Sequence, residues 1–180
     1  GSPTAGFTVQ NQATLCSNKD VALADGSSVD YGSLIRMEIY WDYSNDPTNK
    51  TVDNNPQPGK TYTHNYPEFG TPASKTYTVR YVAYSGINCV STVTKTVTVL
   101  ATPSLQFNAV TPVCSSEAAF QLNQAVLVNG IPGNGTFSGT GVTASGVFSP
   151  AVSGSGSFVI RYTYTGANSC SNYVEQTVNI

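Results

Sequence analysis

The sequence predicts two all-β sandwich domains in tandem, over residues 1–101 and 102–180. Three observations lead to this prediction. Apolar and polar residues alternate with period two through long segments rich in Thr, Tyr and Val, which is typical of half-buried strands. A hairpin-like block near the middle of the chain occurs again at its end. No segment keeps a helical period with capping residues, and Gly and Pro interrupt the chain at turn-like intervals.

The alternating segments predict which side chains face the cores. In the segment 34–43, one face carries Ile35, Met37, Ile39 and Trp41, and the other carries Arg36, Glu38, Tyr40 and Asp42. Further inward positions are Tyr77, Val79, Tyr81 and Ala83 in the first half, and Phe158, Ile160, Tyr162 and Tyr164 in the second. The pairs Val21 and Leu23, and Phe120 and Leu122, mark additional strands. We expect Trp41 to be a core residue of its sandwich.

The repeated block sets the domain organisation. The segment 79–99 aligns without a gap with 160–180, so that Cys89 and Cys170 occupy the same place. Both copies have the pattern of a final hairpin, in which one strand leads through a short turn to a second strand. The first copy ends at Leu100–Pro103, a junction so short that we expect it to restrict bending and keep the domains end to end.

Composition excludes several classes of partner. Only 10% of the 180 residues are charged, against roughly 25% in ordinary soluble domains, and the net charge is -2. A nucleic acid or an anionic membrane would favour a basic surface, so we expect neither as a partner. The sequence contains no apolar run long enough for a transmembrane helix and no secretion signal. We therefore expect a segment from the interior of a longer exported protein.

The four cysteines allow three pairings. Each predicted domain has one cysteine near its beginning and one in its final hairpin, so symmetry favours Cys16 with Cys89 and Cys114 with Cys170. The alternative is a set of reduced or metal-bound thiols. No C-x2-C spacing supports a metal site, and wide, even spacing is typical of an exported disulfide framework.

The first domain resembles a PKD domain over residues 3–101. The resemblance depends on Trp41-Asp42-Tyr43, on His64-Asn65-Tyr66 and on the strand Lys75-Thr76-Tyr77-Thr78-Val79. The chain departs from the family at Ser44-Asn45-Asp46 and in a longer insert from Pro47 to Gly59. The resemblance implies a β-sandwich fold, and the departures concern the local turn.

The second domain, residues 102–180, resembles the Ig-like repeats of large Bacteroidetes surface proteins. The motifs are Gly133-x-Gly135-x-Phe137-Ser138-Gly139-x-Gly141-Val142, Phe148-Ser149-Pro150, and Tyr162-Thr163-Tyr164-Thr165 before Cys170. The resemblance implies an array of repeats in a protein of the type IX secretion system, such as a gliding-motility adhesin. Its partners would include neighbouring repeats of the same chain.

The residues provide little support for catalysis, cofactors or metals. The glycine-rich run lacks the spacing of a phosphate-binding loop, because Ser138 stands where a glycine is needed. His64 is the only histidine and has a structural position in the resembling family. Asp42, Asp46 and Asp53 could hold Ca2+ around the insert, although solvated loop carboxylates are the simpler interpretation. We expect no cofactor and no enzymatic activity.

Tyrosines are the candidate ligand contacts. Tyr40, Tyr43, Tyr62 and Tyr84 are expected on outer faces or loops, where flat aromatic rings can bind a surface glycan or a protein. The alternative is that they are ordinary strand tyrosines.

Two functions remain in competition. The leading hypothesis is a non-catalytic extracellular module, either a stalk and spacer or an adhesive segment of a large surface protein. The alternative is an accessory carbohydrate-binding module of a secreted hydrolase.

Overall fold

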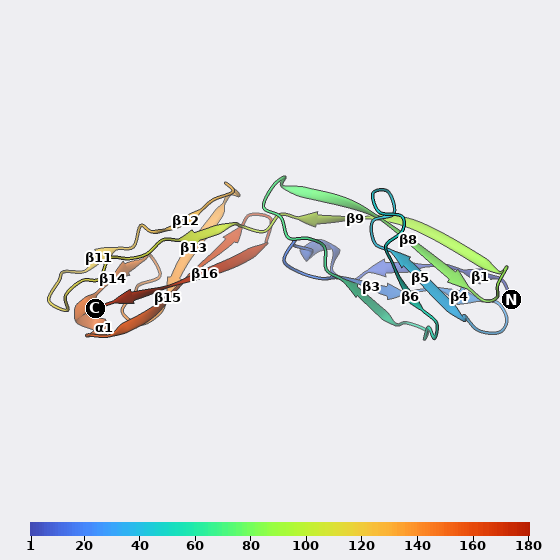
Figure 1. Cartoon of the computed structure of the whole chain (residues 1–180), viewed down its shortest axis with the longest axis horizontal. Helices are drawn as coiled ribbons and strands as arrows, with labels where there is room; N and C mark the ends of the chain where they lie inside the picture. The colour runs from blue at the N-terminus through green and yellow to red at the C-terminus, as the bar shows by residue number, and fades with distance from the viewer. The chain divides into compact units, whose positions relative to one another are not determined.

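The structure is a computed structural model that describes residues 1–180. It is an all-β protein with antiparallel sheets; its helices are the short α1 (Pro150–Ser153) and the 3-10 turn η1 (Gln12–Thr14). The chain divides into two compact units, Gly1–Ala101 and Thr102–Ile180. Figure 1 shows the strands of the first unit in blue to yellow-green and those of the second in yellow to red.

The larger sheet of the first unit has the strand order β6-β5-β8-β9. These strands are β6 (Lys50–Asp53), β5 (Arg36–Tyr40), β8 (Ser74–Tyr84) and β9 (Val90–Leu100). The hairpin of β8 and β9 pairs in register from Ser74 with Leu100 to Tyr84 with Val90. This long ladder confirms the final hairpin that the sequence predicts for the first half.

The smaller sheets of the first unit complete the sandwich. One has the order β2 (Phe7–Val9), β3 (Val21–Asp25) and β7 (Thr61–His64), and a two-stranded ribbon pairs β1 (Pro3–Thr4) with β4 (Ser28–Val29). The strand that Val21 and Leu23 predict is confirmed as β3, where buried and half-buried residues alternate and these two side chains face the core.

The core of the first unit lies on the inward side of both sheets. Its fully buried members include Phe7, Leu15, Val21, Leu23, Met37, Ile39, Val79, Tyr81, Val97 and Val99. The Tyr81 ring lies 5.1 Å from the Phe7 ring and 6.1 Å from the Tyr62 ring. Trp41 is buried as predicted, whereas Ile35 is 48% exposed because it precedes the first residue of β5.

The N-terminal segment of the first unit lies parallel to β9. Cys16 and Leu100 form a parallel bridge, in which Leu100 N donates to Leu15 O (2.9 Å) and Ser17 N donates to Leu100 O (2.8 Å). Three side-chain bonds extend this contact: Ala5 N to Ser91 Oγ, Lys95 Nζ to Phe7 O, and Gln12 Nε2 to Thr98 O. The N-terminal segment and β9, which begin and end the unit, are therefore joined along their length by hydrogen bonds.

The second unit contains three small antiparallel sheets. Its strands are β10 (Leu105–Phe107) with β12 (Ala125–Leu127), β11 (Phe120–Gln121) with β14 (Val147–Phe148), and β13 (Gly133–Ser138), β15 (Ser157–Gly166) and β16 (Ser171–Asn179) in that order. The β15–β16 ladder confirms the second predicted hairpin. The core consists of Phe107, Val110, Leu122, Phe148, Ile160 and Val178.

The glycines 133 and 135 lie in β13, an edge strand, rather than in a ligand-binding loop. A Cβ added at Gly135 would collide with the phenol group of Tyr162 on β15. The Tyr162 ring also packs against Phe137 at a centroid distance of 4.7 Å. The absent side chain at Gly135 therefore provides the space that Tyr162 occupies.

Candidate binding surface

The outer face of the β6-β5-β8-β9 sheet gathers three of the four tyrosines predicted as ligand contacts. On this face, paired residues point the same way across neighbouring strands. Tyr40 pairs with Lys50 on one side and with Arg80 on the other, and Arg36 pairs with Tyr84. We call Arg36, Glu38, Tyr40, Lys50 and Tyr84 the Glu38 cluster.

Glu38 is the centre of this cluster and is only 2% exposed. Its Oε1 forms ion pairs with Arg36 and with Lys50 Nζ, the latter at 2.9 Å. Its Oε2 accepts hydrogen bonds from the hydroxyls of Tyr40 (2.9 Å) and Tyr84 (3.2 Å). Four donors thus satisfy one buried carboxylate, which is the condition for keeping a charge out of water.

The cluster fixes the charge states of its members. Burial acts to raise the pKa of Glu38, but the hydrogen bonds from Lys50 and Tyr40 and the charges of Lys50 and Arg36 together outweigh it and hold that pKa below its ordinary value. The hydrogen bond to Glu38 raises the pKa of Lys50. Burial, followed by the charge of Glu38, raises the pKa of Tyr84. At neutral pH the face therefore carries ionised Glu38 and Lys50 and an un-ionised Tyr84 hydroxyl.

Arg80 lies beside the cluster and stacks on aromatic rings. Its Cζ is 4.5 Å from the centroid of the Tyr43 ring and 6.0 Å from that of Tyr40. The two tyrosine rings meet edge to face at 5.4 Å. Lys50 Nζ is 5.2 Å from the centroid of the Tyr40 ring. Tyr40 and Tyr43 are thus held in fixed orientations by cations.

The fourth predicted tyrosine does not belong to this surface. Tyr62 on β7 is 6% exposed, and its hydroxyl donates to Asp53 Oδ2 at 2.8 Å. Burial raises its pKa far above the ordinary value. Tyr62 was expected to be outward-facing; instead it packs between the sheets, because Tyr62 and His64 alternate inward along β7.

The three carboxylates proposed for Ca2+ do not come together. Asp42 accepts from Asn45 Nδ2 in the turn after β5, and Asp46 accepts from the Thr48 hydroxyl in the same turn. Asp53 lies at the opposite end of β6, where Lys60 Nζ binds it at 2.7 Å and lowers its pKa. No group of three acidic, histidine or cysteine side chains is arranged to hold a metal. The proposed calcium site is therefore wrong.

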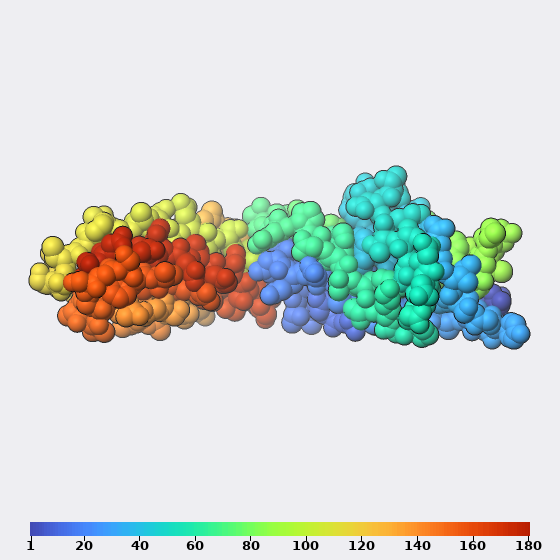
Figure 2. All heavy atoms as spheres, turned by 60° about the horizontal axis from the view of Figure 1, so that its bottom comes forward, coloured from blue at the N-terminus to red at the C-terminus, as the bar shows by residue number.

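His64 belongs to an aromatic stack. Its ring lies on that of Trp41 at 4.7 Å and 9° and meets Tyr66 edge to face at 4.8 Å. Burial lowers the His64 pKa, against the opposing charge of Asp20. A hollow of about 230 Å³ adjoins this stack and is also lined by Asp42 and residues of the turn between β5 and β6. That turn projects from the surface of the first unit in Figure 2.

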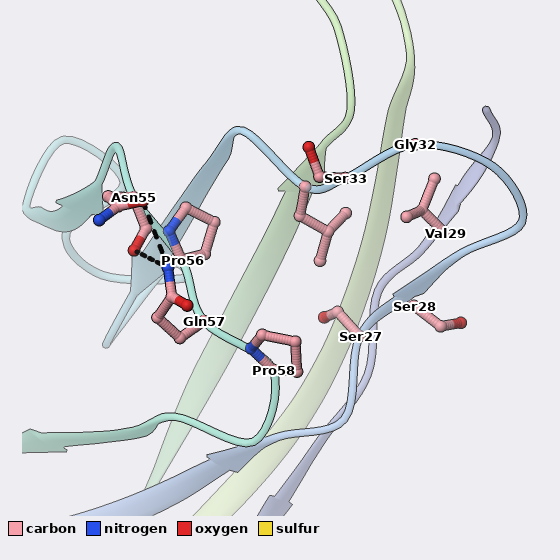
Figure 3. Close-up of a pocket in the computed structure, with 10 residues that line it drawn as sticks. Ser27, Ser28, Val29, Gly32, Ser33, Asn55, Pro56, Gln57 and Pro58 are labelled. Atoms are coloured by element: carbon pink, nitrogen blue, oxygen red, sulfur yellow. Dashed lines mark hydrogen bonds between the residues drawn. The ribbon is translucent and has the colours of Figure 1, made fainter.

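A larger hollow of about 510 Å³ lies between the segments 27–34 and 55–58. Figure 3 shows the serine-rich segment on one side and Asn55–Pro58 on the other. Gln57 Nε2 donates a hydrogen bond to Asn55 Oδ1 at 3.3 Å, so these two side-chain amides bind each other. The lining contains hydroxyl, amide and proline groups and no charged side chain, and no feature of the sequence had singled it out.

The cysteine pairing predicted from symmetry is wrong. Cys89 and Cys114 are exposed free thiols, whereas Cys16 and Cys170 are the disulfide-bonded cysteines. Cys89 lies in the turn of the β8–β9 hairpin, where its carbonyl accepts from Ser85 N. The equivalent positions in the two hairpins thus have different chemical states.

We expect two thiols per chain to react when the native protein is treated with a maleimide without reductant. Peptide mass spectrometry should locate the label on Cys89 and Cys114, because both are exposed, and not on Cys16 or Cys170. The Cys89→Ser variant should react at one thiol. Labelling of none of the four would contradict the two free thiols, and a disulfide-linked peptide of Cys16 with Cys89 would then establish the pairing that symmetry favours.

Comparison with known structures finds low similarities to sandwich domains. The PKD1 domain of Vibrio anguillarum Epp is 16% identical with a TM-score of 0.41, covering 56% of this chain and 96% of that chain. The fibronectin(III)-like modules of Clostridium thermocellum CbhA are 13% identical with a TM-score of 0.36, and the match covers 97% of this chain and 94% of that chain. Drosophila N-cadherin EC1-4 is 11% identical with a TM-score of 0.37. That match covers 99% of this chain and 49% of the cadherin chain, so this chain spans about half of its length. No protein-family model and no curated protein matches the chain.

Two residues of the surface were missed by the sequence interpretation. Glu38 was assigned to the outer face correctly but not recognised as buried, and Arg80 was not considered as a binding residue. The signal for the burial of Glu38 was its place between Arg36 and Tyr40 on a strand that pairs with Lys50. The long side chains of such cationic and hydroxyl-bearing neighbours can cover a carboxylate. No sequence pattern distinguished Arg80 from other arginines.

Proposed function

We propose that the chain is a non-catalytic spacer module of an exported protein and that it carries tensile force. The observation that carries this proposal is the parallel contact between the N-terminal segment of the first unit and β9, through Leu15, Ser17 and Leu100. A force that separates the two ends of this unit acts along the strands. The hydrogen bonds between the two segments are then loaded in shear and share the force. In a geometry that peels strands apart, the bonds open one after another, and each bears the whole force in turn.

Two further features support an exported, non-catalytic role. Disulfide bonding of Cys16 and Cys170 is typical of oxidising compartments. The only histidine is stacked against Trp41 and Tyr66, whereas a Ser-His or Cys-His device needs that imidazole beside a nucleophile. Separately, none of the helices is long and apolar enough to cross a membrane.

The finer proposal is that the module belongs to an array of repeats in a surface adhesin. The residue motifs that resemble PKD and Bacteroidetes Ig-like repeats support this context, including type IX secretion and a role in gliding motility. In such an array the partners are the neighbouring repeats of the same chain. A full-length reading frame with many such repeats would support the adhesin, and a single adjacent hydrolase domain would support the accessory role.

Forced unfolding tests the spacer. With handles at residues 1 and 101 and the disulfide reduced, the double variant Gln12→Ala, Lys95→Met should unfold about tenfold faster under load, because two bonds between the N-terminal segment and β9 are removed. Single-molecule force spectroscopy measures this rate.

Thr96→Ala is the matched control, since Thr96 is an exposed β9 residue with no side-chain hydrogen bond. It should leave the rate unchanged. Equal rates for the double variant and the wild-type chain would refute the proposal that this contact carries the force.

The second candidate function, carbohydrate binding, is favoured by the outer face of the larger sheet. Tyr40 and Tyr43 are half-exposed and fixed by cations, which gives a sugar ring a rigid surface to contact. This function is compatible with a spacer, since the outer face is not part of the contact between the N-terminal segment and β9.

A further inference from the structure

Arg80 is an arginine without a polar partner. Its Nε is buried and has no hydrogen-bond partner, and no carboxylate lies within ion-pair distance of its guanidinium. Arg161 in the second unit provides the contrast. It stacks on Tyr173 at 4.0 Å as Arg80 stacks on Tyr43, but its guanidinium is paired with Glu175 at 2.8 Å. Arg36 Nε is buried without a partner in the same way, but the Arg36 guanidinium is paired with Glu38. Arg80 is half-buried and its guanidinium has no such pair, so its terminal nitrogens are free to bind an acceptor from outside the chain.

The charge of the surrounding face favours an anionic acceptor. Arg36, Lys50 and Arg80 are cations, and Glu38 is the carboxylate among them. Glu38 is buried and already bound by four donors, so it has no free oxygen to compete for Arg80. The face is therefore cationic on a protein whose net charge is -2, and it attracts anions locally.

The neighbouring side chains fit the rest of a sugar. Tyr43 and Tyr40 present half-exposed rings beside Arg80. On β9, Thr94 pairs directly with Arg80 and therefore lies on the same face; the exposed side chains of Thr92 and Thr96 flank it along the strand. A sugar ring can stack its C–H face on an aromatic ring and exchange hydrogen bonds with such hydroxyls.

We propose that Arg80, Tyr43 and Thr94 form a binding site for an acidic polysaccharide, in which Arg80 binds the carboxylate of a uronic acid residue. The planar guanidinium matches a carboxylate with two parallel hydrogen bonds, and its stacking on Tyr43 fixes it in the required orientation. The site rests on the second candidate function and names its ligand class. It is independent of the spacer.

Isothermal titration with tetragalacturonate at low salt tests the proposal. The wild-type chain should bind it, and Arg80→Gln should weaken binding by about tenfold or more, because a charge-assisted bidentate contact is lost. Fully methyl-esterified tetragalacturonate has the same sugar rings without charge and should bind at least about tenfold more weakly to the wild-type chain. Affinity should also fall as salt is added.

Arg161→Gln is the matched control, because it removes an arginine that stacks on tyrosine but is already paired; it should leave the affinity unchanged. Arg80→Lys keeps the charge but not the fork, and should lose most of the affinity. A melting curve verifies that each variant is folded.

The possible outcomes separate the two proposals. Equal binding of the acid and its ester, unchanged affinity of Arg80→Gln, or no binding of tetragalacturonate by the wild-type chain would each overturn the acidic site. A chain that binds dextran sulfate but does not bind tetragalacturonate would also overturn the carboxylate assignment. Equal binding of the acid and the methyl ester that is lost in Tyr43→Ala but kept in Arg80→Gln would retain carbohydrate binding and reject only its acidic specificity.

Discussion

Replacing Tyr81 with alanine is expected to lower the free energy of unfolding of the first unit by about 4 kcal/mol. Tyr81 is fully buried on β8, and its ring contacts those of Phe7 and Tyr62. Removing the ring leaves a cavity between the two sheets that neighbouring side chains can fill only partly. The loss also withdraws the hydroxyl that donates to Asp25 Oδ1 at 3.1 Å.

The Tyr81→Phe variant separates the ring from the hydroxyl. It keeps the packing but leaves the buried Asp25 with one donor fewer, so the expected cost is about 1–2 kcal/mol. Denaturant unfolding followed by circular dichroism measures both values. Tyr31→Ala is the control, since Tyr31 is 83% exposed and its loss should change little. An alanine variant at position 81 as stable as the wild-type chain would contradict the position of Tyr81 in the core.

Replacing Glu38 with glutamine is expected to lower the free energy of unfolding at pH 7 by about 2 kcal/mol. The uncharged glutamine cannot form ion pairs with Arg36 and Lys50. Its amide nitrogen also places a donor where the hydroxyls of Tyr40 and Tyr84 need an acceptor. The cost stays below that of a deeply buried pair because Arg36 and Lys50 are partly exposed and can be solvated.

The same carboxylate makes stability depend on pH. Its pKa is lower in the folded chain than the ordinary value of 4.5, so its contribution is present above pH 4.5 and is lost as the pH falls through the folded pKa. Urea unfolding between pH 7 and pH 3 should therefore show a smaller loss in Glu38→Gln than in the wild-type chain.

Glu175→Gln in the second unit is the control for this measurement. Glu175 forms an exposed pair with Arg161 and should contribute little. An identical pH profile for Glu38→Gln and the wild-type chain would show that the Glu38 cluster does not contribute to stability.

The sequence predicted the strands and the two final hairpins because side-chain alternation directly records which face of a strand is buried. Met37, Ile39 and Trp41 are buried together, as are Val79, Tyr81 and Ala83. The prediction failed at Ile35 because alternation does not reveal where a strand begins.

The candidate site was predicted only in part. Tyr40, Tyr43 and Tyr84 lie on one outer face, but Tyr62 does not, although the alternation of Thr61, Tyr62 and Thr63 contained the information that Tyr62 points inward. The cysteine pairing could not be obtained from the repeat, because similarity of two hairpins says which positions correspond and not which sulfur atoms meet. The lack of an ion-pair partner for the Arg80 guanidinium depends on neighbours distant in sequence, and no local pattern encodes it.

The space at Gly135 links two positions in the evolution of the second unit. The phenol of Tyr162 occupies the volume of the absent side chain. A substitution at either position therefore changes which residues the other position can accept. Homologous repeats should therefore show covariation, with glycine at the position of Gly135 where an aromatic residue occupies that of Tyr162, and larger residues admitted only where the ring is lost. Such a pair would serve as a sequence fingerprint for recognising further copies of this unit.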